Sequence, residues 1–329
     1  MPVSWDLVAD IGGTNARFSA VAKGDLTSTY EFHHSVREYP AFSQLIDILR
    51  EEIARVTGWA SPPQRVCLAV ACPPDTDMIR FTNSHWEFSR EQLMAAFQCR
   101  QVSLINDFEA VAHGVTELQF NDRIQIGGDA PRADKPVAIL GAGTGLGVAA
   151  LVPSRGGYHV VDTEGGHVDF APNNALQMAV LEHLLKQYPR VSLERVLSGV
   201  GLVNIYSAIA KIRGKTRQLE LPAEVVSEAL EGTDSVAEET LSLFCDVLGS
   251  AAGNLALTYG ARGGVYIAGG VVPRFQDFLL ASSVRSAFEN KGRFSTYLNP
   301  IPIFLVTRAN LGLLGAAKKL QRDEELIHA

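Results

Sequence analysis

Cysteine is scarce in this chain, and the few that occur are not spaced as a metal or redox motif. Four cysteines are present among 329 residues, and none of them forms a Cys-x-x-Cys pair. The chain also starts at Met1 without a charged and then apolar leader. Both features predict a protein of the reducing cytoplasm without a disulfide framework.

The chain equally lacks a basic block and a long uninterrupted apolar run. Lys and Arg number 29 against 36 Asp and Glu, which gives a net charge of −7. Nucleic-acid and membrane-surface proteins carry a positive electrostatic footprint that is missing here. The longest uncharged stretch, 136–154, is interrupted by glycines and indicates two buried strands around a turn. We therefore expect no nucleic-acid partner, no membrane partner, and small-molecule chemistry.

Length and periodicity indicate an α/β protein with two domains. The chain is too long for one typical core, and 47% hydrophobic residues suffice for two. Apolar runs of strand type alternate with segments of helical spacing, which favours α/β architecture. The expected helices are 42–56, 89–97, 175–187, 235–257, 275–290 and 313–325, and further expected strands are 65–71 and 264–268. The polar segment 212–222 is predicted to be a surface loop.

Two glycine-centred turns are the most informative part of the sequence. Residues 10–15 read Asp-Ile-Gly-Gly-Thr-Asn and residues 141–145 read Gly-Ala-Gly-Thr-Gly, each between two strand-like runs. Glycine lets backbone N–H groups approach phosphate oxygens closely. Aligned on their Gly-Thr pairs, the segments repeat one pattern, which predicts two related halves with a phosphate turn in each. For either copy alone, a simple tight turn is an equally good interpretation.

Other nucleotide-binding motifs do not match the residues of this sequence. A dinucleotide fingerprint would need a glycine where Leu146 or Val148 stands. The segment Gly214-Lys215-Thr216 imitates the end of a P-loop, but Ile209 occupies the position of the first glycine. NAD binding is therefore disfavoured, and the lysine segment is predicted to be a surface turn.

A second polar group follows a predicted strand at 102–105. Asn106 and Asp107 come directly after this apolar run, and a helical segment follows them. Ligands of open α/β sheets bind at the carboxyl ends of strands, so these side chains are candidates for a site. Both are also good helix N-caps, and taken alone that role is the stronger interpretation.

In combination, these motifs resemble the bacterial glucokinase family of the non-zinc type. That family lies within the superfamily of sugar kinases, heat-shock ATPases and actins. The segments that carry the resemblance are 10–17, 104–108, 141–147, 164–172, 194–199 and 267–270. The resemblance implies a two-lobed, duplicated ribonuclease-H-like fold of the actin-like ATPase type, with a cleft between the lobes. It also implies a small α/β domain of residues 1–117 plus 308–329 and a larger, more helical domain of residues 118–307.

The activity implied by the resemblance is ATP-dependent phosphorylation of D-glucose at the 6-hydroxyl, which yields glucose 6-phosphate and ADP. Asp107 would be the general base that takes the hydroxyl proton, a contribution worth roughly 10²–10⁴-fold. A kinase for mannose, fructose or an N-acetylated amino sugar is the alternative within the same class. An actin-like or chaperone-like ATPase is the alternative from another class. A sugar-dependent regulator is disfavoured because nine residues precede Asp10, which leaves no room for a DNA-binding module.

The resemblance also implies the residues that hold the sugar. They are Asn106, Glu164, His167 and Glu194, with Asp107 and the backbone of Gly145 nearby. Carboxylate, amide and imidazole groups complement the paired hydroxyls of a hexose. Alone, Glu164 and His167 could simply belong to a polar turn, and Glu194 to an exposed helix face.

The ATP site implied by the resemblance consists of the two glycine turns and a third glycine pair. Its residues are Asp10, Ile11, Gly12, Gly13, Thr14, Asn15, Gly143, Thr144, Gly269 and Gly270. Asp10 would reach Mg²⁺, through water, beside the phosphates, although it could instead only tie down its turn.

We expect no structural zinc. A related sugar-kinase family places a cysteine cluster after the histidine, but here no cysteine lies between His167 and Cys245. A homodimer is the expected assembly, as is common for cytoplasmic sugar kinases. The glycines at 312 and 315 would allow close packing of the last helix, although a plain buried helix explains them equally well.

Overall fold

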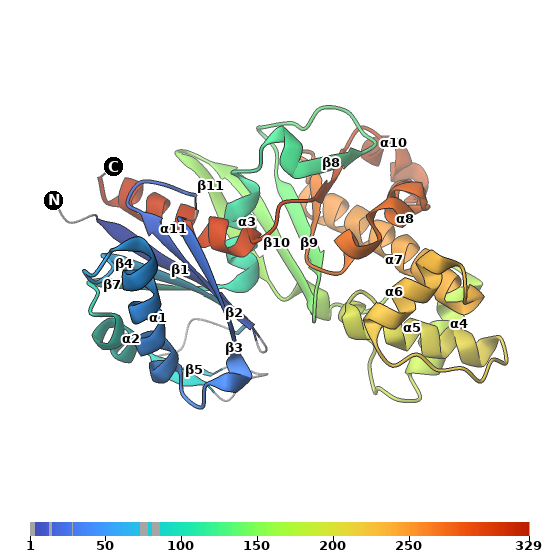
Figure 1. Cartoon of the computed structure of the whole chain (residues 1–329). Coiled ribbons are helices and arrows are strands. Elements are labelled where there is room, and N and C mark those ends of the chain that lie inside the picture. The colour runs from blue at the N-terminus through green and yellow to red at the C-terminus, as the bar shows by residue number, and fades with distance from the viewer. Residues whose placement is uncertain (1–3, 13–14, 28, 73–77, 81–85, 329) are drawn as a thin grey trace. The chain divides into compact units, whose positions relative to one another are not determined.

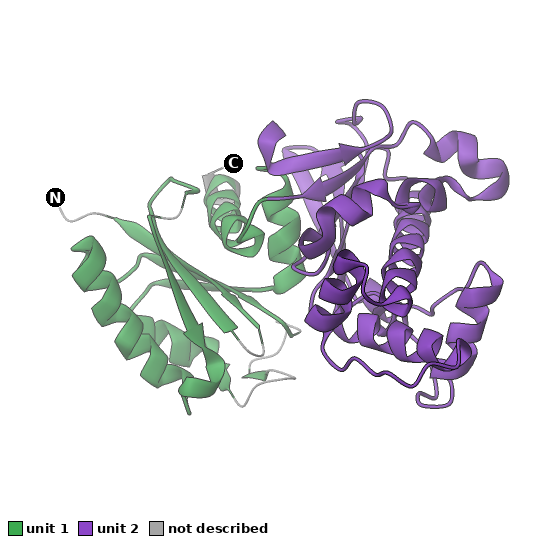
Figure 2. Ribbon diagram, turned by 45° about the vertical axis from the view of Figure 1, so that its right-hand side comes forward, with its two compact units in different colours: residues 1–119, 308–329 green, residues 120–307 purple. Residues whose placement is uncertain are grey.

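The structure is a computed structural model that describes residues 4–12, 15–27, 29–72, 78–80 and 86–328. The chain forms two compact units, one of residues 1–119 with 308–329 and one of residues 120–307 (Figure 2). Each unit has its own hydrophobic core. The first boundary lies two residues beyond the expected position 117, and the functional division into a small and a large domain stays a prediction.

The sheet of the first unit has the strand order β3-β2-β1-β4-β7 (Figure 1). Its strands are β1 (Trp5–Ile11), β2 (Asn15–Ala22), β3 (Tyr30–Ser35), β4 (Arg65–Val70) and β7 (Gln101–Asn106). The three strands that come first in the chain form an antiparallel meander, and β4 and β7 run parallel to β1. The predicted hairpin around the first glycine turn and the predicted strand at 65–71 are thus confirmed.

Helices cover both faces of this sheet. They are α1 (Phe42–Thr57), α2 (Arg90–Phe97), α3 (Asp107–Val115) and α11 (Leu311–His328), and a small hairpin of β5 (Met78–Arg80) and β6 (Glu87–Ser89) lies apart from the sheet. Side chains of β1 alternate between the faces, because Leu7 and Ala9 join the core with α1 and α2, while Val8 joins the core with α11. Both faces of the sheet are therefore buried, as parallel strands require.

Glycines allow the two helices α3 and α11 to pack closely. A Cβ atom added at Gly315 would lie 1.6 Å from the carbonyl oxygen of Ala110, and one added at Gly114 would lie 2.5 Å from that of Leu311. The close packing predicted from the glycines at 312 and 315 is therefore confirmed.

The second unit repeats the strand order of the first and adds one edge strand. Its sheet runs β11-β10-β9-β12-β13-β8. The strands are β8 (Arg123–Ile126), β9 (Val137–Ala142), β10 (Leu146–Ser154), β11 (Gly157–Thr163), β12 (Val265–Ala268) and β13 (Ile303–Val306). Here too three consecutive strands, β9 to β11, form an antiparallel meander, and two strands parallel to β9 follow. The added edge strand, β8, precedes the meander in the chain and pairs antiparallel with β13. The predicted duplication is visible in this shared topology.

The second unit is richer in helix. Its α-helices are α4 (Ala175–Leu184), α5 (Gly199–Ile212), α6 (Pro222–Glu231), α7 (Ser235–Tyr259), α8 (Gln276–Ala281), α9 (Val284–Glu289) and α10 (Ser295–Leu298). Of the helices in the described part of the chain, α7 is the one long and apolar enough to cross a membrane. Most of that stretch is buried within the unit, as in the core helix of a globular protein, so it is weak evidence for a membrane span.

One predicted helix is wrong. The segment 275–290, expected as one helix, breaks into α8 and α9. Ser282 ends α8 with an extended backbone, and its hydroxyl oxygen accepts a hydrogen bond from the amide of Val284. Ser283 donates its hydroxyl to Asp246 of α7. Serine side chains compete in this way with the helical hydrogen bonds, which explains the break.

Candidate functional site

The carboxyl ends of three parallel strands meet at one edge of the sheet in the first unit. In the strand register Ile11 lies beside Val70, and Val70 lies beside Asn106. The first glycine turn follows β1 at this edge, and Asp107 begins α3 at the same edge. The structure therefore brings Asp10 and the Asn106-Asp107 pair to the same sheet edge, on strands β1 and β7 that flank β4, and open α/β sheets bind ligands at such an edge.

Asp10 lies near the end of β1 in a largely buried position. Burial raises the pKa of its carboxyl group, and the nearby Arg17 guanidinium offsets part of this effect. Arg17 Nη1 lies 3.3 Å from Asp10 Oδ2. Within the turn, the amide of Gly12 donates to the carbonyl oxygen of Asn15. Asp10 is thus a carboxylate at the mouth of a glycine turn, held on one side by a cation.

Gly312, in the first turn of α11, lies beside the Asp10 carboxylate. A Cβ atom added at Gly312 would lie 3.2 Å from Asp10 Oδ2. The first turn of α11 therefore approaches the carboxylate closely, 302 positions away along the chain. The spacing of the glycines indicated close packing of this helix, but the sequence did not indicate that Gly312 packs against Asp10.

Asn106 is the N-cap of α3. Its Oδ1 accepts hydrogen bonds from the amides of Phe108 at 2.7 Å and Glu109 at 3.3 Å. The capping interpretation is thus correct for the carbonyl oxygen, and it fixes the start of the helix that carries Asp107. The capping bonds use Oδ1, so the Asn106 amide nitrogen takes no part in them.

Asp107 is the first residue of α3 and lies near Cys72, which follows β4. Burial raises the pKa of the Cys72 thiol to about 11, and the charge of Asp107 contributes. The thiol is therefore neutral at physiological pH beside this carboxylate.

The second glycine turn links β9 and β10 in the other unit. The amide of Gly143 donates to the carbonyl oxygen of Gly145, and the carbonyl oxygen of Gly143 accepts from the amide of Gly199. In the parallel pair β9 and β12, Gly141 lies beside Ala268, so Gly269 and Gly270 follow at the same sheet edge. Gly269 has a positive φ of 89°, and a Cβ atom there would lie 2.4 Å from the carbonyl oxygen of Ala142. Only glycine fits this approach.

Glu194 reaches the same turn from a short helical segment, η4 (Leu193–Arg195). Its Oε2 accepts a hydrogen bond from the amide of Leu146 at 2.9 Å. A Cβ atom added at Gly145 would lie 2.4 Å from that oxygen. Glu194 is half-buried rather than part of an exposed helix face, and the turn needs glycine at position 145 to accommodate it.

Glu164 and His167 lie on an exposed segment that packs against the same turn. Their side chains are 72% and 58% exposed, with His167 Nε2 3.8 Å from Glu164 Oε2. The intervening helical turn η3 (Gly165–His167) fits closely, since a Cβ atom at Gly166 would lie 2.0 Å from the carbonyl oxygen of Leu146. The segments η3 and η4 also contact each other. The structure thus brings Glu164, His167, Glu194 and Gly145 together.

Two predicted site residues, Gly13 and Thr14, lie outside the described residues. Thr144 is exposed at the second turn, and Asn15 is exposed at the start of β2. In the part of the chain that the structure describes, no group of three or more His, Cys, Asp or Glu side chains could hold a metal ion. A metal that binds chiefly through substrate phosphates and water needs only one or two protein carboxylates, and Asp10 fits that mode.

Comparisons with known proteins agree with this arrangement. The family model described as Glucokinase matches residues 7–323. A glucokinase of Tolumonas auensis is 44% identical over 316 residues, which cover 96% of this chain and 97% of the relative. A glucokinase of Klebsiella pneumoniae is 43% identical over 318 residues, with 96% and 97% of the two chains covered.

Solved structures of glucokinases share the fold of this chain. A glucokinase from an Antarctic psychrotroph superposes with a TM-score of 0.85 at 37% identity, covering 97% of this chain and 99% of the other. A ROK family glucokinase from Streptomyces griseus, solved in complex with glucose and AMPPNP, shares the fold with a TM-score of 0.66 at 18% identity, covering 97% and 100%. The predicted α/β fold of actin-like ATPase type is confirmed, and the chain belongs to the glucokinase family.

Proposed function

We propose that the chain transfers the γ-phosphoryl group of ATP to the 6-hydroxyl of D-glucose, with Asp107 as the general base. The chain is an enzyme of the glucokinase family that phosphorylates glucose with ATP. The observation that carries the assignment of the base is the position of Asp107 at the start of α3, on the sheet edge that also holds the Asp10 turn. A carboxylate there can accept the proton as the sugar oxygen attacks phosphorus.

Glucose would be held by hydrogen bonds from two sets of side chains. Asn106 and Asp107 would contact the reacting end of the sugar, and Glu164, His167 and Glu194 would contact its other hydroxyls. This proposal is supported by the joint packing of η3, η4 and the β9–β10 turn around Gly145. Discrimination at the sugar C2 position depends on these contacts, so mannose, fructose or an N-acetylated amino sugar is the alternative acceptor.

ATP would bind along the two glycine turns and the glycine pair after β12. Backbone amides at the turns can donate to phosphate oxygens, and Gly269 with Gly270 leaves room beside the adenosine. Asp10 would hold Mg²⁺ through water, and the ion would neutralise charge on the β- and γ-phosphates. Its partial burial disfavours the ionised carboxylate, which a bound cation would stabilise.

Glucose binding would exclude water from the reacting groups, because water there would accept the phosphoryl group. We therefore expect slow ATP hydrolysis when sugar is absent. We further propose that the enzyme acts in the cytoplasm as a homodimer, without a nucleic-acid or membrane partner.

The test is ADP production from Mg-ATP with glucose, mannose, fructose, N-acetylglucosamine or no sugar. Asp107→Ala should lower turnover with glucose by roughly 10²–10⁴-fold and leave the melting temperature unchanged within a few degrees. Asp47→Asn, an exposed carboxylate on α1, is the matched control and should match the wild type. If only a sugar other than glucose supports turnover, that sugar is the acceptor and the assignment of glucose is wrong. ATP hydrolysis indifferent to sugar and to Asp107 would refute the kinase mechanism.

A further inference from the structure

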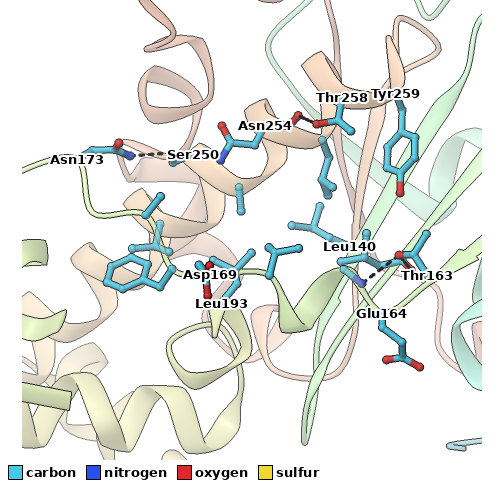
Figure 3. A pocket seen from close by; sticks show the side chains of 18 of the residues that line it. Leu140, Thr163, Glu164, Asp169, Asn173, Leu193, Ser250, Asn254, Thr258 and Tyr259 are labelled. Carbon is cyan, nitrogen blue, oxygen red and sulfur yellow. Dashed lines mark hydrogen bonds between the residues drawn. The ribbon is translucent and has the colours of Figure 1, made fainter. Parts of the chain in front are cut away.

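A cavity of about 450 Å³ lies inside the second unit, between α7 and the segment that connects β11 to α4 (Figure 3). Its lining on α7 extends from Val247 to Tyr259, about 18 Å of helix at 1.5 Å per residue. The sheet contributes Leu140 and Val148, and the connecting segment contributes Phe170. The walls are mainly apolar, and the volume is that of sites for small organic molecules.

Polar groups gather at one end of this cavity. Asn173 Nδ2 donates to Ser250 Oγ at 2.8 Å, a contact drawn in Figure 3, and Lys291 Nζ donates to the same oxygen at 2.9 Å. Gln177 also lines this end and is only 2% exposed. Its Oε1 accepts a hydrogen bond from the amide of Asn173, which leaves the Gln177 Nε2 amide group as a donor.

These donors have no acidic partner among the described residues, and Asp169, which also lines the cavity, pairs with Arg190 instead. Within the described residues, Gln177 Nε2 makes no hydrogen bond, and Lys291 forms no ion pair. Burial lowers the pKa of the Lys291 ammonium group, and no carboxylate offsets that effect. A donor on the cavity wall that no described protein group satisfies and a half-buried cation without a counter-charge are both groups that an anionic ligand would satisfy.

We propose that this cavity is a second ligand site, which binds a small organic monocarboxylate with an apolar body. The carboxylate would accept from Gln177 Nε2 and be attracted by the charge of Lys291, which lies behind the lining residue Ser250, and the apolar body would lie along α7 between Val247 and Tyr259. The site is separate from the glycine turns that are proposed to hold phosphate. Its occupant would replace water against the apolar walls and satisfy the donors at the polar end.

Binding of a ligand in this cavity should also change the affinity for glucose. Glu164 and Gly165 line the opposite end of the cavity, and Glu164 belongs to the proposed sugar site. A ligand that packs against this segment would order it before glucose arrives, so glucose should bind with a lower KM. This consequence rests on the proposed function, whereas the binding itself does not.

The direct test is calorimetric titration of the full chain, without substrates, with octanoate, octanamide and acetate. Octanoate should bind, while octanamide lacks the charge and acetate lacks the apolar body, so both should bind at least about tenfold more weakly. Equal affinity for octanoate and octanamide, or no heat with octanoate at millimolar concentration, would overturn the proposal.

Variants of the polar end sharpen the test. Gln177→Glu keeps the acceptor for the Asn173 amide but replaces the free donor by a carboxylate, and Lys291→Met keeps the stem and removes the charge. Each should weaken octanoate binding by about tenfold or more. Lys215→Met, an exposed lysine of the loop after α5, is the matched control and should bind octanoate like the wild type.

Circular dichroism identifies any variant that fails to fold, and the other variant then decides the outcome. Unchanged octanoate affinity in a folded variant would refute the site. In glucose kinetics, octanoate binding without a change in KM would overturn the coupling, even if the sugar kinase activity is intact.

Discussion

The contact between Gly145 and Glu194 allows a sharp test of the proposed sugar site. In Gly145→Ala, the new methyl group would start 2.4 Å from Glu194 Oε2, whereas real Cβ atoms essentially never approach below 3.0 Å. The carboxylate must therefore move by at least about 0.6 Å, the difference between these distances. The backbone at position 145 has no positive φ, so alanine adds no conformational strain there.

The expected loss in kcat/KM follows from the hydrogen bond that this movement of the Glu194 carboxylate breaks. Glu194 Oε2 accepts the Leu146 amide at 2.9 Å, and a hydrogen bond to a charged group contributes about 1.5–3 kcal/mol. That range corresponds to roughly ten- to 150-fold in an equilibrium constant. A misplacement of about 1 Å in a substrate-positioning group can itself cost about 10²-fold in rate. We expect kcat/KM for glucose to fall by roughly ten- to 100-fold.

The free energy of unfolding should fall by no more than the lost hydrogen bond, about 1.5–3 kcal/mol, because Glu194 is a flexible side chain that can swing away from the new methyl group. The assay is glucose phosphorylation measured against glucose concentration, together with thermal unfolding. Gly199→Ala is the matched control, since its nearest contacts would lie at an ordinary 3.5 Å. Wild-type kcat/KM in folded Gly145→Ala would refute the role of Glu194 at the sugar site.

Three further predictions concern stability and pH. Gly315→Ala would place a methyl group 1.6 Å from the carbonyl oxygen of Ala110, so it should destabilise the first unit by about 3 kcal/mol or more, measured by urea unfolding. Asp234→Ala removes the N-cap of α7 and the acceptor of the Tyr206 hydroxyl, which should cost about 2–3 kcal/mol in the same assay. Asp10→Asn should raise the melting temperature at pH 7 while it weakens the Mg²⁺ dependence of turnover.

The pH dependence of these stability effects distinguishes the two aspartates. Burial opposes ionisation of Asp234, but hydrogen bonds from Tyr206 and two backbone amides lower its pKa overall. Its stabilisation is therefore present above the unfolded-state pKa of about 3.9 and is lost as the pH falls through the folded-state pKa. Asp10 has a raised pKa, so its ionisation opposes folding at neutral pH and ceases to do so in acid. Asp10→Asn should therefore stabilise less at pH 4 than at pH 7, and the opposite trend would contradict the burial argument.

Local sequence signals predicted much of the fold because they depend on neighbours along the chain. Both glycine turns are flanked by paired strands, and the helical spacing of 42–56 corresponds to α1, which ends at a glycine with positive φ. The family resemblance implied Asp107 from a motif whose context is the end of a strand and the start of a helix. That context is present in β7 and α3.

Long-range contacts could not be predicted in the same way. Glu194 and the Leu146 amide are 48 positions apart, and the letters around each describe only their own segments. The break between α8 and α9 depends on Asp246 of α7, which lies 37 positions before Ser283. The apolar cavity combines strands, a connecting segment and α7, so its volume is a property of packing and has no local signature.

The duplicated topology explains why the charged side chains lie at the first glycine turn and the apolar cavity lies beside the second. Both units contain the same hairpin around a glycine turn, but its paired positions differ: Asp10 lies opposite Arg17 in the first unit, and Leu140 lies opposite Val148 in the second. When the two Gly-Thr pairs are aligned, Leu140 takes the place of Asp10. The first copy thus has a carboxylate and a cation at its turn, which suits metal and phosphate. The second has apolar side chains that line a cavity instead. Both copies keep the glycine turn proposed to bind phosphate, and only the first has a carboxylate at the position before the turn, where the second has the cavity-lining Leu140.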